Sequence, residues 1–128
     1  VEARGMSAIS DGILQRWFSP PYRQDNHADF KGYRNMLERT PVAGYVGTCH
    51  ALRDADFTTT TPHLQVPTLC VVGRDDGSTP PALVRQLADL IAGAHYHIID
   101  GAGHLPCIEQ PDALYALMHP FLQRVFKS

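Results

Sequence analysis

The sequence has no apolar run long enough to cross a bilayer and no cluster of lysines and arginines. The first absence argues against a membrane-spanning helix, and the second argues against nucleic acid or an anionic membrane surface as the partner. The formal net charge of -2 at pH 7 is close to neutral and agrees with this. The remaining composition, 44% hydrophobic and 19% charged residues over 128 positions, is typical of one soluble globular domain.

Cysteine is scarce, and its spacing excludes the usual roles of paired cysteines. Cys49, Cys70 and Cys107 stand far apart, and none forms a CxxC pair. An odd number at wide spacing argues against a disulfide framework and predicts a reducing, cytoplasmic compartment. No HExxH motif is present, and His95 and His97 merely alternate along one face of a predicted strand. We therefore expect no metal site, and a metal-binding module is kept as a minor alternative.

The first half of the sequence predicts three helices. The first helix ends at the prolines of positions 20 and 21, and its apolar face is formed by Met6, Ile9, Ile13 and Trp17. The second helix is expected to run from Asn26 or His27 to Arg39. The third is expected to have Thr40 as its N-cap and Pro41 as its first residue. Its apolar side is formed by Val42, Tyr45, Val46, Cys49 and Leu52.

The second half alternates between strand and helix. Residues Val66 to Gly73, "VPTLCVVG", are a short apolar run that predicts a strand buried on both faces, as in a parallel sheet. A helix with Thr79 as N-cap and Pro80 as first residue follows. Its buried side is expected to comprise Leu83, Val84, Leu87, Leu90 and Ile91. A second strand, "AHYHIID", and a loop, "GAGHLPCIEQ", lead to a last helix that opens at position 111 and that Pro120 is expected to kink or interrupt.

The predicted sheet is too small to stand alone. Strand, helix, strand and helix form a right-handed βαβ unit with one covering helix. Two parallel strands leave open edges and bury little core. The chain also opens on Val1, without a methionine, and runs straight into a predicted helix. We therefore expect it to be the later part of a larger α/β domain, or to complete its sheet with another chain.

Candidate catalytic side chains follow both predicted strands. Asp75 and Asp76 follow the first strand, and His104 follows the second. Sites of open α/β sheets lie at the carboxyl ends of the strands, so these loops should lie side by side. An acid beside an imidazole is the Asp–His half of a nucleophilic triad, in which the carboxylate fixes the ring tautomer and stabilises the imidazolium. In hydrolases of this architecture the chain order is nucleophile, acid, histidine.

The nucleophile is the member that the sequence does not supply. No serine stands in a G-x-S-x-G pattern, which is the usual elbow for such a nucleophile. The nearest match, "GTCHA", would make Cys49 the nucleophile. We reject this match because the motif lies inside the third predicted helix and no buried strand precedes it.

Three stretches carry a resemblance to a known family. "VPTLCVVGRDDGSTPP", "IIDGAGHLPCIEQP" and "GYVGTCHALRDADF" together resemble the C-terminal half of an α/β-hydrolase, and are most similar to the 3-oxoadipate enol-lactonases. The resemblance covers essentially the whole chain. It implies a helical cap over residues 1–56, a linker over 57–65, and the last two parallel strands of the main sheet with their helices over 66–128, so that the sheet is incomplete in this chain.

The resemblance also implies roles for individual residues. The acid is Asp76, three residues after Gly73, rather than Asp75, and the base is His104. Trp17 and Arg53 become candidate pocket residues, with Arg53 as a partner for a substrate carboxylate. The nucleophilic serine and the oxyanion hole belong to the family's N-terminal half, so this chain alone is expected to be inactive. No metal or organic cofactor is implied, and the partners are a small lactone or carboxylate and the chain that completes the sheet.

The resemblance therefore implies the hydrolysis of 3-oxoadipate enol-lactone to 3-oxoadipate, a step of aromatic catabolism in the β-ketoadipate pathway. Two alternatives stay open. One is another α/β-hydrolase with the same acid and base, such as a carboxylesterase or a cofactor-free haloperoxidase. The other is a non-catalytic interaction domain or fragment that uses its open sheet edge to bind a partner.

Overall fold

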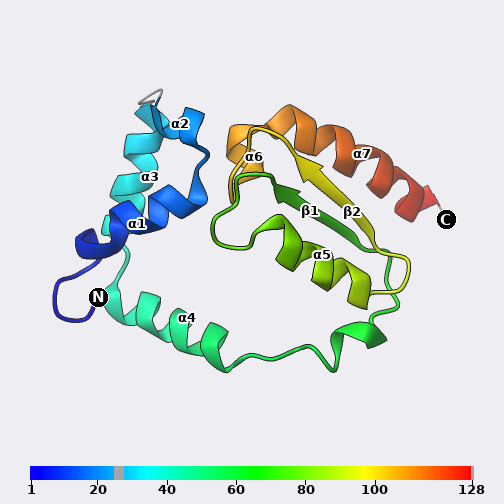
Figure 1. Ribbon diagram of the computed structural model, residues 1–128, viewed down its shortest axis with the longest axis horizontal. Helices are drawn as coiled ribbons and strands as arrows, with labels where there is room; N and C mark the ends of the chain where they lie inside the picture. Colours follow the sequence, from blue (N-terminus) through cyan, green and yellow to red (C-terminus); the bar gives the residue numbers. More distant parts are fainter. Residues whose placement is uncertain (25–27, 128) are drawn as a thin grey trace.

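The chain forms a helical first half and a small α/β second half (Figure 1). The structure, a computed structural model, describes residues 1–24 and 28–127. The first half contains α1 (Ser7–Trp17), α2 (Pro20–Gln24), α3 (Ala28–Glu38) and α4 (Val42–Asp54). The second half contains the short 3-10 helix η1 (Thr61–His63), β1 (Leu69–Gly73), α5 (Pro81–Leu90), β2 (His95–Ile99), α6 (Pro106–Glu109) and α7 (Pro111–Lys127).

The second half is built on two parallel strands. β1 pairs with β2 in parallel, from Leu69 opposite His95 to Gly73 opposite Ile99. Helix α5 connects the strands and packs on both, α7 packs against β1, and Figure 1 shows the strands lying between the two helices. The predicted βαβ arrangement with a covering helix is therefore confirmed. None of the helices in the described part of the chain is both long and apolar enough to cross a membrane.

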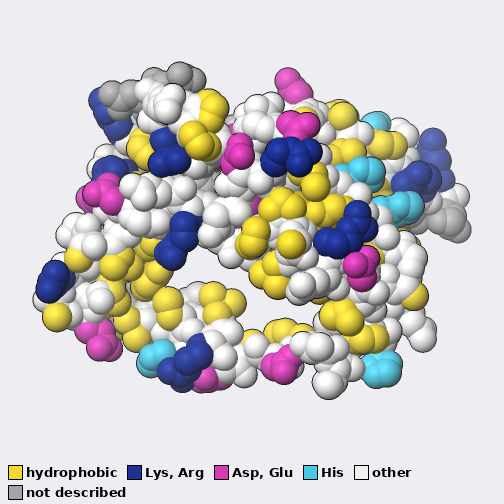
Figure 2. All heavy atoms as spheres, in the orientation of Figure 1, with side chains coloured by type: hydrophobic (Ala, Val, Ile, Leu, Met, Phe, Trp, Pro, Cys, Tyr) yellow, Lys and Arg dark blue, Asp and Glu magenta, His cyan; other side chains and the backbone are white. Residues whose placement is uncertain are grey.

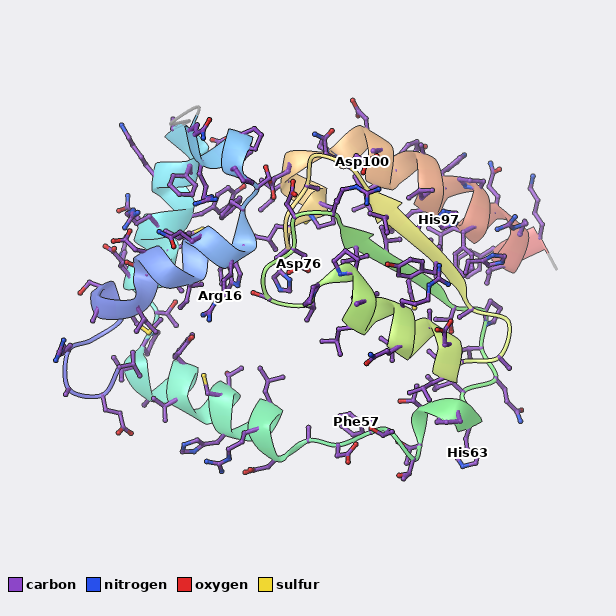
Figure 3. The ribbon with its side chains drawn as sticks, viewed as in Figure 1. Arg16, Phe57, His63, Asp76, His97 and Asp100 are labelled. Carbon is purple, nitrogen blue, oxygen red and sulfur yellow. The ribbon has the colours of Figure 1, made fainter. Side chains whose placement is uncertain are left out.

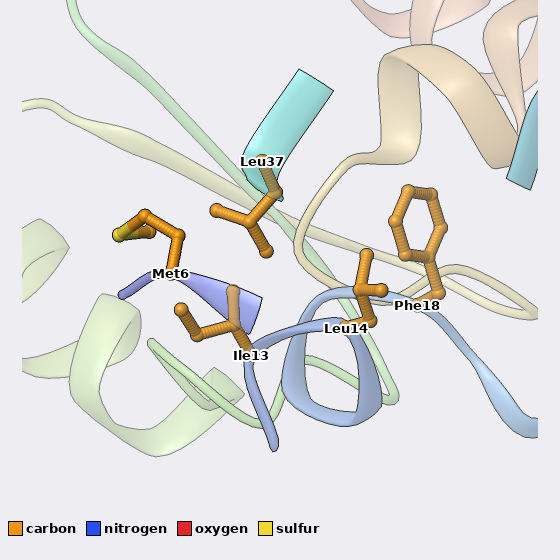
Figure 4. Close-up of a cluster of buried hydrophobic side chains, with 5 residues drawn as sticks. All are labelled: Met6, Ile13, Leu14, Phe18 and Leu37. Atoms are coloured by element: carbon orange, nitrogen blue, oxygen red, sulfur yellow. The ribbon is translucent and has the colours of Figure 1, made fainter. Parts of the chain in front are cut away.

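The first half has a hydrophobic core of its own. Its buried side chains are Met6, Ile13, Leu14, Phe18 and Leu37 (Figure 4). The Phe18 ring stacks on Tyr22 and Tyr33 and meets Phe30 edge to face, with centroid distances of 5.0, 5.4 and 5.5 Å. This aromatic cluster joins α1, α2 and α3 just beyond Trp17, and thereby fixes the segment of the first half that faces the second.

Two predicted helix caps are wrong by one residue. Helix α4 begins at Val42 rather than Pro41, and α5 begins at Pro81 rather than Pro80. Neither threonine caps its helix. The hydroxyl of Thr40 donates to the Met36 carbonyl at 3.1 Å, and that of Thr79 donates to a carboxylate described below. Each hydroxyl donates to an acceptor in the segment before the helix. In Ser, Thr, Asn and Asp such local hydrogen bonds compete with helix capping.

Prolines also begin or continue helices where the sequence predicted a stop. α1 ends at Trp17 as predicted, but the prolines at 20 and 21 open the short helix α2, since the first turn of a helix needs no proline N–H. α7 continues through Pro120, which lies on its exposed side, so the carbonyl that loses its donor can face water. The predicted loop of residues 101–110 contains the one-turn helix α6. The predicted start of the second helix, at Asn26 or His27, lies outside the described residues.

Several predicted apolar faces are left uncovered. No residue of α4 is buried; Cys49 is exposed, and the Leu52 side chain is 72% exposed. Along α5, Leu83 and Leu87 are also about half exposed, at 48% and 45%, whereas Ile91 is buried. Figure 1 shows α4 standing apart from the other elements. Only the start of α4 is partly covered, since Val42 and Tyr45 are half-buried against the core of the first half. The prediction that these faces are buried is therefore wrong for most of their length in the described part of this chain.

Candidate active site

The loops that follow β1 and β2 lie against each other at the carboxyl end of the sheet. The Arg74 N–H donates to the Ile99 carbonyl and the Asp75 N–H to the Ala102 carbonyl, both at 2.9 Å. Gly73 is required here, because a Cβ atom at this position would overlap the backbone oxygens of Ala102 and Gly103. The close contact brings Asp76, which Figure 3 labels at the end of the sheet, to His104.

Asp76 is a buried carboxylate with four polar neighbours. Oδ1 accepts hydrogen bonds from the backbone N–H groups of Ser78 and Thr79 at 2.8 and 2.9 Å. Oδ2 accepts one from the Thr79 hydroxyl at 2.8 Å and lies 2.9 Å from His104 Nδ1. Burial is the largest single influence and raises the pKa of the Asp76 carboxyl, but the hydrogen bonds from His104, Thr79 and Ser78 together lower that pKa below its usual value. The group is therefore an anion at neutral pH.

His104 is oriented by that carboxylate and remains accessible. Because the Asp76 carboxylate can only accept a hydrogen bond, the ring proton of His104 lies on Nδ1, which donates to it. Nε2 is then free to accept a proton. The Thr79 hydroxyl lies 3.3 Å from the same Nδ1 atom. The side chain of His104 is 32% exposed, whereas that of Asp76 is 4% exposed. This geometry is the one expected of an orienting acid and a general base in a nucleophilic triad.

Trp17 reaches the same site from the first half. The His104 backbone N–H donates to the Trp17 carbonyl at 2.7 Å, and the two rings stack with centroids 6.2 Å apart and planes 25° apart. The neighbouring Arg16 carbonyl accepts from the Gly77 N–H at 3.0 Å. Trp17 also lines a cavity of about 330 Å³ together with Tyr33, Met36, Leu37, Thr40, Leu105 and Ile108. The end of α1 is thus hydrogen-bonded to both loops, the one after β1 and the one after β2.

Arg53 is not brought to this site. It lies at the end of α4 with 67% of its side chain exposed and forms an ion pair with its neighbour Asp54. Arg16 is placed differently: Figure 3 shows its side chain pointing from α1 into the hollow that Figure 2 shows between α1, α4, the linker and α5. Arg16 makes no ion pair with any residue in the described part of the chain.

Sequence reasoning missed three residues that contact the site. The sequence predicts Thr79 as a helix cap, although a Thr three residues after an Asp also fits a closed turn around that carboxylate. The sequence predicts no role for Glu109, since no spacing rule connects it to distant backbone N–H groups. Arg16 had no signal beyond its position next to Trp17. Within residues 1–24 and 28–127, no three His, Cys, Asp or Glu side chains are grouped so as to hold a metal ion.

An Asp–His pair on consecutive strand ends of a parallel α/β unit is the arrangement expected of hydrolases with this fold. The family model for the alpha/beta hydrolase family matches residues 2–117, and the chain belongs to this family.

Two relatives are closely similar along nearly the whole chain. 3-Oxoadipate enol-lactonase 1 of Acinetobacter baylyi is 31% identical over 127 residues, which are 98% of this chain and 47% of that protein. The crystal structure of the enol-lactonase from Burkholderia xenovorans LB400 superposes with a TM-score of 0.90 at 34% identity, over 95% of this chain and 46% of that one. The predicted resemblance and fold class are confirmed.

A third protein has nearly the same fold. A thermophilic esterase from Thermogutta terrifontis superposes with a TM-score of 0.86 at 27% identity, over 95% of this chain and 45% of that one. The chain therefore spans about half the length of the relatives it matches.

Proposed function

We propose that this chain is the C-terminal part of a serine hydrolase that opens the ring of 3-oxoadipate enol-lactone to give 3-oxoadipate. The observation that carries this proposal is the 2.9 Å contact between Asp76 and His104 Nδ1, with the Trp17 ring stacked beside the imidazole. The choice of lactone follows the two enol-lactonases, which match this chain from end to end at 31% and 34% identity.

The proposed mechanism uses Nε2 of His104 twice. A serine on the other half of the fold attacks the lactone carbonyl while Nε2 takes its proton, and backbone N–H groups of that half hold the oxyanion. Collapse of the tetrahedral intermediate breaks the bond to the ring oxygen, which receives the proton from the imidazolium. The ring oxygen is now an enol that stays on the acyl group and tautomerises to the ketone. Water then attacks the acyl-serine with Nε2 again as base, and the second tetrahedral intermediate breaks its bond to the serine oxygen, which takes the proton back from the imidazolium. Asp76 stays ionised throughout and stabilises each imidazolium.

The carboxylate of the lactone needs a cationic partner near this base. We assign Arg16 to that role in place of Arg53, because Arg16 points into the hollow beside the catalytic loops and has no competing ion pair in the described chain. Arg53 is already paired with Asp54 at the far end of α4. A guanidinium matches a carboxylate with two parallel hydrogen bonds, so it orients the ring as well as binding it.

The rest of the sheet is proposed to come from the other half of the same fold. β1 has β2 on one side only, and each side of the pair carries an uncovered apolar helix face. On α5 this face borders a cavity of about 410 Å³ with Phe57 at its rim, and its leucines are Leu83, Leu87 and Leu90. On α7 the corresponding groove is lined by Leu114, Met118 and Leu122. The relatives are about twice as long as this chain, so they contain enough polypeptide to cover both faces.

A chimaera tests the proposed function. This chain replaces the part of the Burkholderia xenovorans enol-lactonase that it matches, and loss of the enol-lactone is followed by ultraviolet absorbance. We expect turnover by the chimaera and none by the 128-residue chain alone. A folded chimaera that cleaves p-nitrophenyl esters but ignores the lactone would favour the carboxylesterase alternative, to which the similarity with the Thermogutta terrifontis esterase gives support. A folded chimaera inert toward both substrates would favour the interaction domain.

A further inference from the structure

One carboxylate joins the loop of the base to the helical first half. Glu109, the last residue of α6, accepts a hydrogen bond from the Gly103 N–H at Oε1, at 2.8 Å. Its other oxygen, Oε2, accepts one from the Ser19 N–H at 2.9 Å. Gly103 immediately precedes His104, and Ser19 lies two residues after Trp17. The two donors that Glu109 bridges therefore flank the two rings that stack in the site.

At this bridge the backbone of Gly103 is packed directly against the backbone of the segment from Trp17 to Ser19. A Cβ atom on Gly103 would lie 2.5 Å from the Trp17 carbonyl oxygen and 3.0 Å from the Ser19 nitrogen. Ser19 is 1% exposed and Gly103 is also buried, so water has little access to either N–H. Without the carboxylate, both donors would be left in a buried place with no partner, which is costly. The Glu109 side chain itself is half-buried, which strengthens its hydrogen bonds relative to those in bulk water.

The chemistry of the bridge requires a carboxylate at this distance. Two N–H donors converge on the side chain from different segments, and a carboxylate offers one acceptor oxygen to each. Glutamine has a single acceptor and would direct an NH₂ group at the second donor. Aspartate keeps the charge but is one methylene shorter, so it cannot span both donors in the same backbone geometry.

We propose that Glu109 is the residue that positions the base relative to the cap: it holds the imidazole of His104 against the Trp17 ring. This role rests on the proposed function for its effect on turnover, because only a hydrolase uses His104 as a base. Substrate held by the first half then meets Nε2 at a fixed distance, which general base catalysis requires. Displacing the loop by a fraction of an ångström slows the chemical step and leaves substrate binding nearly intact.

The test compares Glu109→Gln and Glu109→Asp with Asp112→Asn in the complete hydrolase. Asp112→Asn is the matched control, because it removes the same charge three residues further along, and that carboxylate makes no hydrogen bond or ion pair with a side chain or backbone group of residues 1–24 and 28–127. For both Glu109 variants we expect kcat to fall about tenfold or more with KM changed less than about threefold. Amide hydrogen exchange at Ser19 and Gly103 should become about tenfold faster, as expected for the loss of one charge-assisted hydrogen bond. Exchange in β1 should not change.

Each arm has an outcome that overturns the proposal. Unchanged exchange at Ser19 and Gly103 in Glu109→Gln would show that no bridge exists. Faster exchange with unaltered kcat would show that the bridge does not position the base. A Glu109→Asp variant with the kcat and amide exchange of the wild type would show that only the charge of residue 109 matters. kcat is also measured with a p-nitrophenyl ester, since His104 serves any acyl transfer. Failure of the wild-type enzyme on the lactone but not on the ester would therefore reject the proposed substrate and leave the test of Glu109 intact.

Discussion

Replacing Asp76 by asparagine is the sharpest test of the proposed acid. The substitution keeps the shape of the side chain, and its amide oxygen can still accept from the N–H groups of Ser78 and Thr79, which now lie 2.8 and 2.9 Å from Oδ1. The NH₂ group then replaces the oxygen that lies 2.9 Å from His104 Nδ1. Two donors cannot share that contact, so Nδ1 must become the acceptor and the ring proton must move to Nε2.

The expected magnitude follows from the tautomer. A proton on Nε2 removes the lone pair that has to accept the serine proton, whereas the loop and the oxyanion hole are untouched. In a serine protease the same substitution of the triad acid lowers kcat by about 10⁴. We expect a loss of that order here, which corresponds to about 5 kcal/mol of transition-state stabilisation. KM should change little, because the acid does not touch the substrate.

The assay is lactone hydrolysis by the complete enzyme, with Asp75→Asn as the matched control. Asp75 is the adjacent residue and carries the same charge, but its side chain is exposed. Only its backbone N–H takes part in the contact between the two loops. Asp75→Asn should keep activity within about twofold of wild type. An Asp76→Asn enzyme that retained more than about a tenth of wild-type kcat would refute the assignment of the acid.

The acid limb of stability provides an independent check of the same carboxylate. The pKa of folded Asp76 is below its usual value, so the unfolded chain binds the proton more readily than the folded one. Its contribution to the free energy of unfolding is therefore fully present above the ordinary pKa of an aspartate and is lost as the pH falls through the lower, folded value. Urea unfolding of wild type and Asp76→Asn at a series of acidic pH values should show a flatter limb in the variant. If wild type and Asp76→Asn lost stability equally as the pH falls, the hydrogen bonds to the Asp76 carboxylate would be contradicted.

Three further outcomes are expected. Arg16→Ala should raise KM for the lactone about tenfold or more and leave KM for a neutral ester unchanged, whereas Arg53→Ala should change neither KM. Equal effects of the two substitutions in steady-state kinetics would reject Arg16 as the carboxylate partner. Gly103→Ala should destabilise the complete enzyme by about 1–3 kcal/mol in urea unfolding, because its Cβ atom would lie 2.5 Å from the Trp17 carbonyl oxygen; an unchanged midpoint would contradict that contact. Leu87→Asp should weaken binding of this chain to the other half of the fold in a pull-down or titration, because its half-exposed side chain lines the cavity on α5, whereas undiminished binding would place the interface elsewhere.

The order of elements and the pairing of the acid with the base could be predicted because they depend on local patterns. An apolar run bounded by Pro and Gly has few ways to be a strand, and side chains that follow parallel strands must meet at one edge. Cap positions could not be predicted as well. Each of Thr40 and Thr79 could either accept a helix N–H as a cap or donate its hydroxyl to an earlier acceptor, and the choice depends on neighbours that local sequence does not specify.

The exposed faces illustrate a different limit. Hydrophobic periodicity states which side of a helix needs a cover, and does not state whether the cover lies in the same chain. The outer face of α5 and the second half of α4 have the pattern of buried helices and are left open by the described residues. The chain spans about half the length of the relatives it matches, and the proposed cover for these faces is the other half of the same fold.

The sequence by itself determined the class of fold and the family resemblance, and it predicted that Asp76 and His104 meet, because all three depend on residue types at short, regular spacings. Only the tertiary structure decided which side chains complete the site. Thr79, Trp17 and Glu109 act through contacts between segments that are up to 90 residues apart, such as the one between Glu109 and the Ser19 N–H. Such contacts form because the loops after β1 and β2 and the end of α1 are in direct backbone contact. Local sequence patterns do not predict this packing.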